Sequence, residues 1–221
     1  MEQKVGKAKK MLSDIYKYPL ERSYLGSKYH VHYNKYHNGG GPYLIDLFLK
    51  DYSFPKFNSV MEFCSGPGFM GYYLMHKYNL PEVHLVDINP EVKPAIDLTN
   101  QENDWNGIFY LSDALESYDG PKVDFIITNP PHCTNLEQFN QCTNNKRNQK
   151  NILLDQDLSM HKKFANKLNK VLNKNGHLML IENNIYIPAS KLDKLFGLKR
   201  VDYGDIDPAL YYVMYENNLD I

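Results

Sequence analysis

The sequence is poor in cysteine, and it lacks long apolar runs, a secretory signal and an excess of charge of either sign. Its three cysteines are Cys64, Cys133 and Cys142. They cannot all pair and do not show zinc-binding spacing, which favours a reducing, cytoplasmic setting over a secreted one. No apolar run is long enough to span a membrane, and no apolar segment of a signal peptide follows the lysine-rich start. We expect a cytoplasmic protein that binds neither membrane nor metal.

The formal net charge is −1, so composition alone does not indicate nucleic-acid binding. Such binding would need a local basic patch, for which Lys146, Arg147 and Lys150 with the N-terminal lysines are candidates. The 221 residues suffice for one α/β domain with an appendage. We expect the appendage to be residues 1–55 and the domain to be residues 56–221.

The N-terminal part combines a helical pattern with many aromatic residues. Apolar residues recur at helical spacing over residues 2–17, which predicts an amphipathic helix. Residues 18–43 are rich in tyrosine and histidine, and a second short helix is predicted over 43–50. Tyr29 and Tyr33 are candidate contacts to a planar or cationic substrate, although packing against the core would also explain them. The segment is expected to form a helical, tyrosine-rich lid.

From residue 57 onward, strand-like and helix-like patterns alternate, which predicts a parallel sheet covered on both faces. Two further strand-like runs, 198–203 and 210–215, flank a turn and predict an antiparallel hairpin. We therefore expect a Rossmann-like doubly wound, mostly parallel seven-stranded sheet with a C-terminal antiparallel hairpin. Residues 134–151 are polar and are predicted to form a loop. The other predicted strands are 58–63, 83–87, 107–111, 123–128 and 177–182, and the predicted helices are 68–79, 90–103 and 156–173.

The chain is organised around residues 59–71, where an apolar run reaches Glu62 and a turn containing Gly66 and Gly68. A glycine turn between a strand and a helix exposes backbone N–H groups to a ligand. The next predicted strand ends at Asp87, an acid placed to accept from the hydroxyls of a ribose. A nicotinamide enzyme would look similar up to this point, but Pro67 stiffens the turn.

The fourth predicted strand runs into Asn129-Pro130-Pro131-His132. Two prolines fix the backbone, so the Asn129 amide is held at the strand end where ligands bind in open α/β sheets. Its oxygen and the Pro130 carbonyl would accept from an amine N–H and orient the nitrogen toward an electrophile. Asp113, at the end of the third strand, either accepts from an adenine amine or caps a turn.

Residues 57–216 resemble a class I S-adenosylmethionine (SAM)-dependent methyltransferase. The motif at residue 129 resembles the Asn-Pro-Pro-aromatic motif of amino-group methyltransferases, which act on adenine, cytosine or glutamine amides. The resemblance implies SAM as the cofactor and gives Asn129, Pro130 and His132 catalytic roles. It assigns the cofactor contacts to Glu62, Gly66, Gly68, Asp87, Asp113 and Asn129.

The motif departs from the family pattern at His132, where a tyrosine, phenylalanine or tryptophan usually stacks on the target. Because imidazole can also donate, accept or carry a proton, the resemblance to nucleobase methyltransferases is weaker at this position. The net charge is near zero, no separate RNA or DNA module is visible, and the lid is aromatic rather than basic, so we expect N-methylation of a small-molecule or peptide-like amine rather than a nucleic acid. The alternatives are methylation of a nucleobase amine, cyclisation or elimination of SAM itself with release of methylthioadenosine, and a non-catalytic SAM-binding scaffold.

Acidic residues and a histidine near 155–161 complete the candidates. Asp157 and His161 are four residues apart and would share a helix face, with Asp155 nearby. Glu182 ends the fifth predicted strand at the ligand edge. His161 and Glu182 are candidate substrate contacts, although a helix-capping or turn role would explain them equally.

Overall fold

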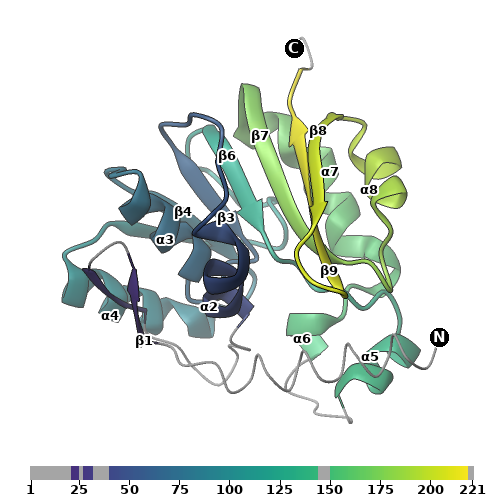
Figure 1. Ribbon diagram of the computed structural model, residues 1–221, viewed down its shortest axis with the longest axis horizontal. Helices are drawn as coiled ribbons and strands as arrows, with labels where there is room; N and C mark the ends of the chain where they lie inside the picture. Colours follow the sequence, from purple (N-terminus) through teal and green to yellow (C-terminus); the bar gives the residue numbers. More distant parts are fainter. Residues whose placement is uncertain (1–20, 25–26, 32–39, 144–149, 219–221) are drawn as a thin grey trace.

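The computed structural model describes residues 21–24, 27–31, 40–143 and 150–218 (Figure 1). A seven-stranded sheet forms its centre, in the order β5-β4-β3-β6-β7-β9-β8. The strands β3 to β7 pair in parallel, and β9 runs antiparallel to both β7 and β8. This confirms the predicted mostly parallel sheet with a C-terminal antiparallel hairpin. The strands are β3 (Val60–Phe63), β4 (Val83–Asp87), β5 (Gly107–Leu111), β6 (Val123–Thr128), β7 (Leu172–Asn183), β8 (Lys199–Asp205) and β9 (Leu210–Glu216).

Helices cover both faces of the sheet, and the side chains of each strand alternate between two apolar cores. In β6, Phe125 and Ile127 join the core beneath α2, η1 and α3, whereas Ile126 joins the core beneath α7 and α8. The helices and helical turns are α2 (Gly40–Leu44), η1 (Ile45–Leu49), α3 (Phe69–Lys77), η2 (Pro90–Val92), α4 (Lys93–Asn103), α5 (Leu136–Thr143), α6 (Lys150–Leu153), η4 (Gln156–Leu158), α7 (Ser159–Val171) and α8 (Ala189–Phe196).

α7 shows how the sequence pattern determines packing. Phe164, Leu168 and Val171 recur at helical spacing and are buried against the sheet. Asp155 lies ahead of the helix and accepts a hydrogen bond from the backbone N–H of Met160 at 2.8 Å. This bond satisfies an N–H group that the first turn leaves without a helical partner. The helix therefore begins where an acid can bind its exposed N–H groups.

Two segments differ from their predicted structure. β1 (Glu21–Tyr24) and β2 (Ser27–His30) form a small antiparallel sheet within the predicted lid segment 1–55, where only the helices 2–17 and 43–50 had been predicted. α5 occupies much of 134–151, which was predicted to be a loop. This helix is amphipathic and buries Phe139 against Cys133 and Leu153, so one apolar face stabilises it despite its polar composition. The predicted helix over 2–17 lies outside the described residues.

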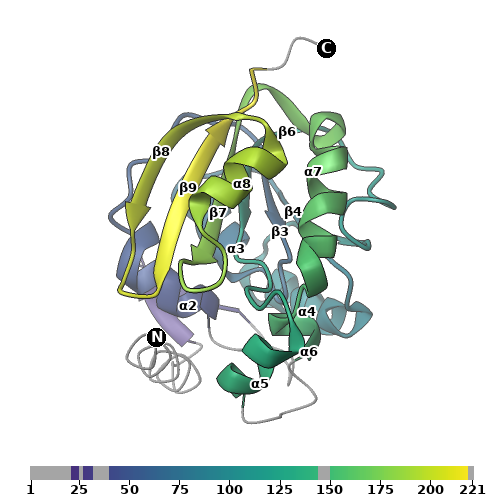
Figure 2. The same ribbon diagram turned by 90° about the vertical axis from the view of Figure 1, so that its right-hand side faces the viewer.

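The strand order reverses at β3, because β4 and β5 extend to one side and β6 returns on the other. Ligands of open α/β sheets bind at such a switch point, outside the carboxyl ends of the strands. Figures 1 and 2 show α5 and α6 below the sheet, near these ends. In the part of the chain that the structure describes, no helix is long and apolar enough to cross a membrane.

Candidate active site

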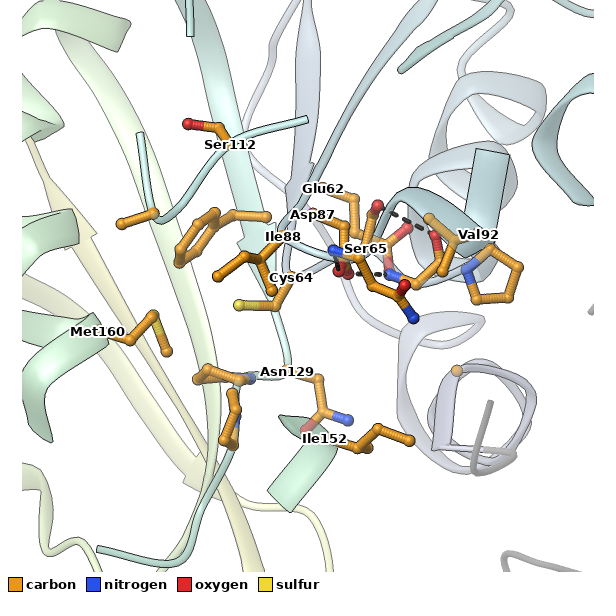
Figure 3. Close-up of a pocket in the computed structure, with 18 of the residues that line it drawn as sticks. Glu62, Cys64, Ser65, Asp87, Ile88, Val92, Ser112, Asn129, Ile152 and Met160 are labelled. Atoms are coloured by element: carbon orange, nitrogen blue, oxygen red, sulfur yellow. Dashed lines mark hydrogen bonds between the residues drawn. The ribbon is translucent and has the colours of Figure 1, made fainter. Parts of the chain in front are cut away.

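A cavity of about 720 Å³ opens at the switch point, at the carboxyl ends of β3, β4, β5 and β6 (Figure 3). This volume is typical of a pocket that holds a small organic ligand. The loops after these four strands supply most of its wall, and α6 and α7 contribute Ile152 and Met160. The polar lining groups are Glu62, Ser65, Asp87, Asn89, Glu91, Ser112, Asp113, Asn129 and His132.

The glycine turn after β3 fits closely against its neighbours. Gly68 has a φ of 85° at the start of α3, in the left-handed region that favours glycine. A Cβ there would lie 2.8 Å from Cδ1 of Leu85. The turn can therefore bring its backbone to the cavity because residue 68 has no side chain.

Glu62 is buried beneath this turn. Its Oε2 accepts from the N–H of Gly71 at 2.7 Å. Burial raises the pKa of this carboxyl to about 8, although the backbone N–H groups of Gly71 and Met70 act in the opposite direction. A cationic ligand in the cavity would favour the ionised carboxylate, so Glu62 is suited to pair with an ammonium group.

The two other predicted cofactor acids differ in their surroundings. Asp87 accepts from the N–H of Gly66 at 2.7 Å and from that of Asn89 at 2.9 Å. It therefore holds the glycine turn in place and also lines the cavity. Asp113 lines the cavity as well, but its carboxylate forms an ion pair with Lys163 of α7. A ligand amine at Asp113 would share that carboxylate with the lysine.

Asn129 follows β6 and lines the cavity together with Pro130 and Pro131. Its Oδ1 atom is buried and has no hydrogen-bond partner among the described residues. A buried acceptor without a partner is costly, so such atoms are rare outside sites that receive a ligand. Figure 3 shows Asn129 and Ile152 toward one end of the pocket and Ser112 toward the other.

His132 begins a chain of four titratable side chains that runs from the cavity into the core. Its Nδ1 lies 2.9 Å from Oε2 of Glu182, and the other oxygen of Glu182 lies 2.7 Å from Nε2 of His161. Nδ1 of His161 lies 2.6 Å from Oδ2 of Asp155. The side chain of His132 is 14% exposed, whereas that of Glu182 is fully buried. The chain therefore has one end at the cavity.

The buried part of this chain is ionised. Burial alone would lower the pKa of His161, but the adjacent carboxylates of Glu182 and Asp155 outweigh it and raise that pKa to about 9. Burial would raise the pKa of both carboxyls, yet hydrogen bonds and the charge of His161 hold the pKa of each below its usual range. At neutral pH a buried imidazolium thus lies between two carboxylates.

Most of the predicted site residues line the cavity, and the others lie beside it, behind it or outside the described residues. The cavity brings together Glu62, Gly66, Asp87, Asp113, Asn129, Pro130 and His132. Gly68 supports the cavity wall from the turn. His161 and Glu182, predicted substrate contacts, do not line the cavity and act behind His132. The side chain of Tyr29 and all of Tyr33 lie outside the described part of the chain.

Several cavity residues and one contact were not predicted from the sequence. Cys64, Ile88 and Met160 line the cavity, and Ile88 has a signal that could have revealed it, since it directly follows the acid that ends β4. Asp155, rather than Asp157, pairs with His161, because η4 intervenes and Asp157 adopts a left-handed conformation with a φ of 55°. Spacing on a continuous helix therefore predicted the wrong acid.

The residues fit SAM on observations made within this structure. The glycine turn offers backbone at the cavity, and Glu62 is a buried acid that lacks a cation among the described ion pairs. Asp87 stands at the end of β4, where a ribose binds in doubly wound folds. Glu62, the turn and Asp87 would hold the cofactor, whereas Asn129 would face the acceptor.

Comparison with known proteins agrees with this fit. The family model of the methyltransferase small domain matches residues 40–203. A ribosomal RNA small subunit methyltransferase C from Alteromonas mediterranea is 32% identical over 92 residues, which are 42% of this chain and 25% of that protein. The matched region thus spans about a quarter of the length of that relative.

Two solved structures share the fold. A 16S rRNA N2 methyltransferase of T. thermophilus, in complex with AdoMet and guanosine, has a TM-score of 0.61 and 16% identity, covering 89% of this chain and 49% of that one. A ribosomal protein L11 methylase from Lactobacillus delbrueckii subsp. bulgaricus has a TM-score of 0.60 and 12% identity, covering 89% and 88%. With the family match over most of its length, the chain belongs to the methyltransferase small domain family of SAM-dependent methyltransferases.

Proposed function

We propose that the chain methylates an exocyclic amine of an RNA nucleobase. The observation that supports this most is the buried Oδ1 of Asn129, which has no partner among the described residues and lines the cavity. An arriving amine would supply the missing N–H donor. The methyltransferase relatives indicate SAM as the cofactor. The oxygen of Asn129, as a hydrogen-bond acceptor, favours an N–H group and therefore nitrogen as the methylated atom.

The amide and the prolines would act by positioning. Asn129 Oδ1 and the Pro130 carbonyl would accept the two N–H groups of the amine and direct its lone pair into the cavity. Pro130 and Pro131 fix the backbone so that both acceptors keep their places. When bound, SAM supplies a sulfonium methyl group, whose C–S bond breaks as the new C–N bond forms and leaves its electron pair on sulfur.

The choice of RNA rests on the relatives. The Alteromonas protein is named for ribosomal RNA, and the T. thermophilus enzyme is titled for N2 methylation and was solved with guanosine. These names support a planar base with an exocyclic amine as the acceptor. The small-molecule or peptide-like amine expected from sequence gains one observation, because no lysine or arginine lines the described cavity. It remains the second candidate.

A product analysis tests the proposal. The protein would be incubated with methyl-labelled SAM and, in separate reactions, with total RNA, a pool of small amines and a pool of peptides. We expect S-adenosylhomocysteine to form together with a methylated nucleoside in the RNA reaction. Label in a small amine or peptide instead would overturn the RNA assignment. Methylthioadenosine would indicate that SAM itself is the substrate, and the absence of any product would favour a scaffold.

Asn129→Ala is the matched variant for this assay. Because Oδ1 of Asn129 has no partner in the described protein, its removal should leave the free energy of unfolding unchanged or slightly higher. Loss of an oriented acceptor should reduce kcat by about 10²–10³-fold, with little change in SAM affinity. A variant with wild-type kcat would contradict the role of the amide.

We also propose that the protein works in a reducing, cytoplasmic compartment. Cys64 and Cys133 are both free thiols in the structure, and Cys133 is buried. Secreted proteins of this size usually form disulfides between such residues. Location of a tagged full-length chain by fractionation would test this, and recovery outside the cytoplasm would contradict it.

A further inference from the structure

We propose that His132 is the catalytic base of the methyl transfer, held in the active tautomer by Glu182 and the buried pair His161 and Asp155. The inference rests on the proposed function, because it assigns the proton that the methylated amine must lose. It also gives a purpose to the one position at which the motif departs from its usual aromatic residue.

The tautomer of His132 follows from the charge of Glu182. An ionised carboxylate has no proton to donate, so the contact at 2.9 Å requires Nδ1 of His132 to carry the hydrogen. The neutral ring then has its lone pair on Nε2. No hydrogen bond joins this atom to a residue of the described chain, and the ring lines the cavity. Nε2 is therefore available to a group that enters the cavity.

The two side chains behind Glu182, His161 and Asp155, keep Glu182 ionised. Oε1 of Glu182 accepts a hydrogen bond from Nε2–H of His161 at 2.7 Å, and Oδ2 of Asp155 accepts one from Nδ1–H of the same ring. Asp155 is itself fixed by the backbone N–H groups of Met160 and His161, at 2.8 and 3.2 Å. Two carboxylates and one imidazolium leave a net negative charge behind His132, which stabilises the imidazolium formed when His132 takes a proton.

The thiol and the phenols near these four side chains remain neutral. Burial raises the pKa of the Cys64 thiol, and it also raises the pKa of Tyr211 and of Tyr215 on β9. Tyr211 donates its O–H to the carbonyl of Ile187 at 2.8 Å and so does not compete for Glu182. Among the described residues, the charge that His132 experiences from this side thus comes from Glu182, His161 and Asp155.

The proton step balances without another reactant. After methyl transfer the nitrogen carries a positive charge, its two original hydrogens and the new methyl group. As the nitrogen becomes tetrahedral, the N–H that faced the Pro130 carbonyl turns away from it. This N–H bond breaks, its electron pair returns to nitrogen, and the proton passes to Nε2 of His132. The imidazolium then releases the proton to water. Since Asn129 holds the amine and His132 lies three residues further along the same loop, one rigid segment provides both groups.

The first test is spectroscopic and needs no acceptor. Histidine labelled with ¹⁵N would be observed by NMR in the wild-type protein with and without SAM, with His132 assigned by its loss in His132→Phe. We expect the Nδ1–H tautomer for neutral His132, and a weaker preference for it in Glu182→Gln, because the amide can donate as well as accept. The Nε2–H tautomer in the wild-type protein would overturn the proposal.

The second test is the pH dependence of kcat, measured with the RNA that serves as the methyl acceptor. The wild-type rate should rise with pH to a plateau, because only a neutral imidazole can accept the proton of the amine. His132→Phe, which restores an aromatic ring of the usual kind, should lower the plateau by about 10²-fold and abolish this rise. Unchanged kcat and pH dependence in His132→Phe would refute the assignment.

The control is His84→Phe, because His84 is also buried and bonded to a glutamate, Glu82, at 3.2 Å, but does not line the cavity. The variant His84→Phe should retain the wild-type dependence of kcat on pH.

The proposed function and the proposed role of His132 fail in different ways. If no RNA is methylated, the proposed function fails. The tautomer of His132 then still tests whether Glu182, His161 and Asp155 hold its ring as proposed. If RNA is methylated and Asn129→Ala is inactive but His132→Phe is not, only the base assignment fails.

Discussion

The backbone N–H of Gly71 donates to Oε2 of Glu62 over 2.7 Å, and a Cβ at residue 71 would lie 3.1 Å from the same oxygen. The end of β3 and the first turn of α3 therefore approach closely because residue 71 is glycine. The same acid lines the cavity. Glu62 thus links the packing of the first helix after the turn to the charge that a bound ligand meets.

This arrangement predicts that SAM binding releases a proton near neutral pH. Because burial raises the pKa of Glu62 from 4.5 to about 8 in the folded protein, the free protein loses stability as pH rises from 4.5 toward 8. A cationic ligand beside the carboxyl favours its ionised form. SAM affinity should therefore increase over the same pH range. Calorimetric titrations in two buffers of different ionisation enthalpy would measure the released proton.

Glu62→Gln is the control for this prediction. The amide keeps the acceptor for the N–H of Gly71 but cannot ionise, so SAM binding should lose its dependence on the buffer. The affinity should also become independent of pH in that range. Equal proton release by wild type and Glu62→Gln would show that another group ionises.

The glycine turn gives a second prediction, in which two similar substitutions act on different properties. Gly68→Ala should destabilise the protein by about 1–3 kcal/mol, because the φ is 85° and the new methyl would meet Leu85 at 2.8 Å. Gly66 has a φ of 50° with open space around its Cβ position, and it lines the cavity. Gly66→Ala should therefore be less destabilising but should weaken SAM binding. Urea unfolding and SAM titration of both variants would separate the effects.

The buried ion chain gives a third prediction, on stability against pH. The pKa of His161 is about 9 in the folded protein and 6.5 as its ordinary value, a difference that corresponds to about 3 kcal/mol. Because the folded value is the higher one, this stabilisation is complete below 6.5 and is lost as pH rises through 9. His161→Gln should remove that pH-dependent contribution.

Denaturant unfolding of wild type and His161→Gln at closely spaced pH values would measure the pH-dependent contribution of His161 to stability. Glu62 lowers stability between 4.5 and 8 in both proteins, so the difference between their curves isolates His161. The difference should be largest at acidic pH, above the range in which Asp155 and Glu182 take up protons, and should shrink toward pH 9. A difference independent of pH would mean that His161 is neutral in the fold.

The fold was predictable because it depends on local patterns repeated along the chain. Each strand from β3 to β6 is a short apolar run, and its end carries an acid or amide that the topology brings to one edge. The Asn129-Pro130-Pro131 motif was predictable for a related reason, since two prolines leave the backbone little freedom. These features need no knowledge of distant contacts.

The contacts that join His132 to Glu182, His161 and Asp155 were not predictable, because they form between distant parts of the sequence. Glu182 meets His132 across 50 residues and His161 across 21, and no spacing rule relates these positions. The choice of Asp155 over Asp157 depends on a left-handed turn inside η4. α5 was missed since its apolar face is defined by the partner it buries, Cys133 and Leu153, and these lie on other segments.

The last prediction concerns Ile88, which follows the acid at the end of β4. Ile88 is 56% exposed although it is apolar, and it lines the cavity. A flat apolar part of the ligand, such as the adenine of SAM, would cover it. Ile88→Ala should therefore weaken SAM binding about tenfold, equivalent to about 1.4 kcal/mol, without destabilising the free protein. Leu98→Ala is the matched control, because Leu98 is 45% exposed on α4 and does not line the cavity. Fluorescence or calorimetric titration with SAM would compare the two, and equal affinities would show that the adenine lies elsewhere.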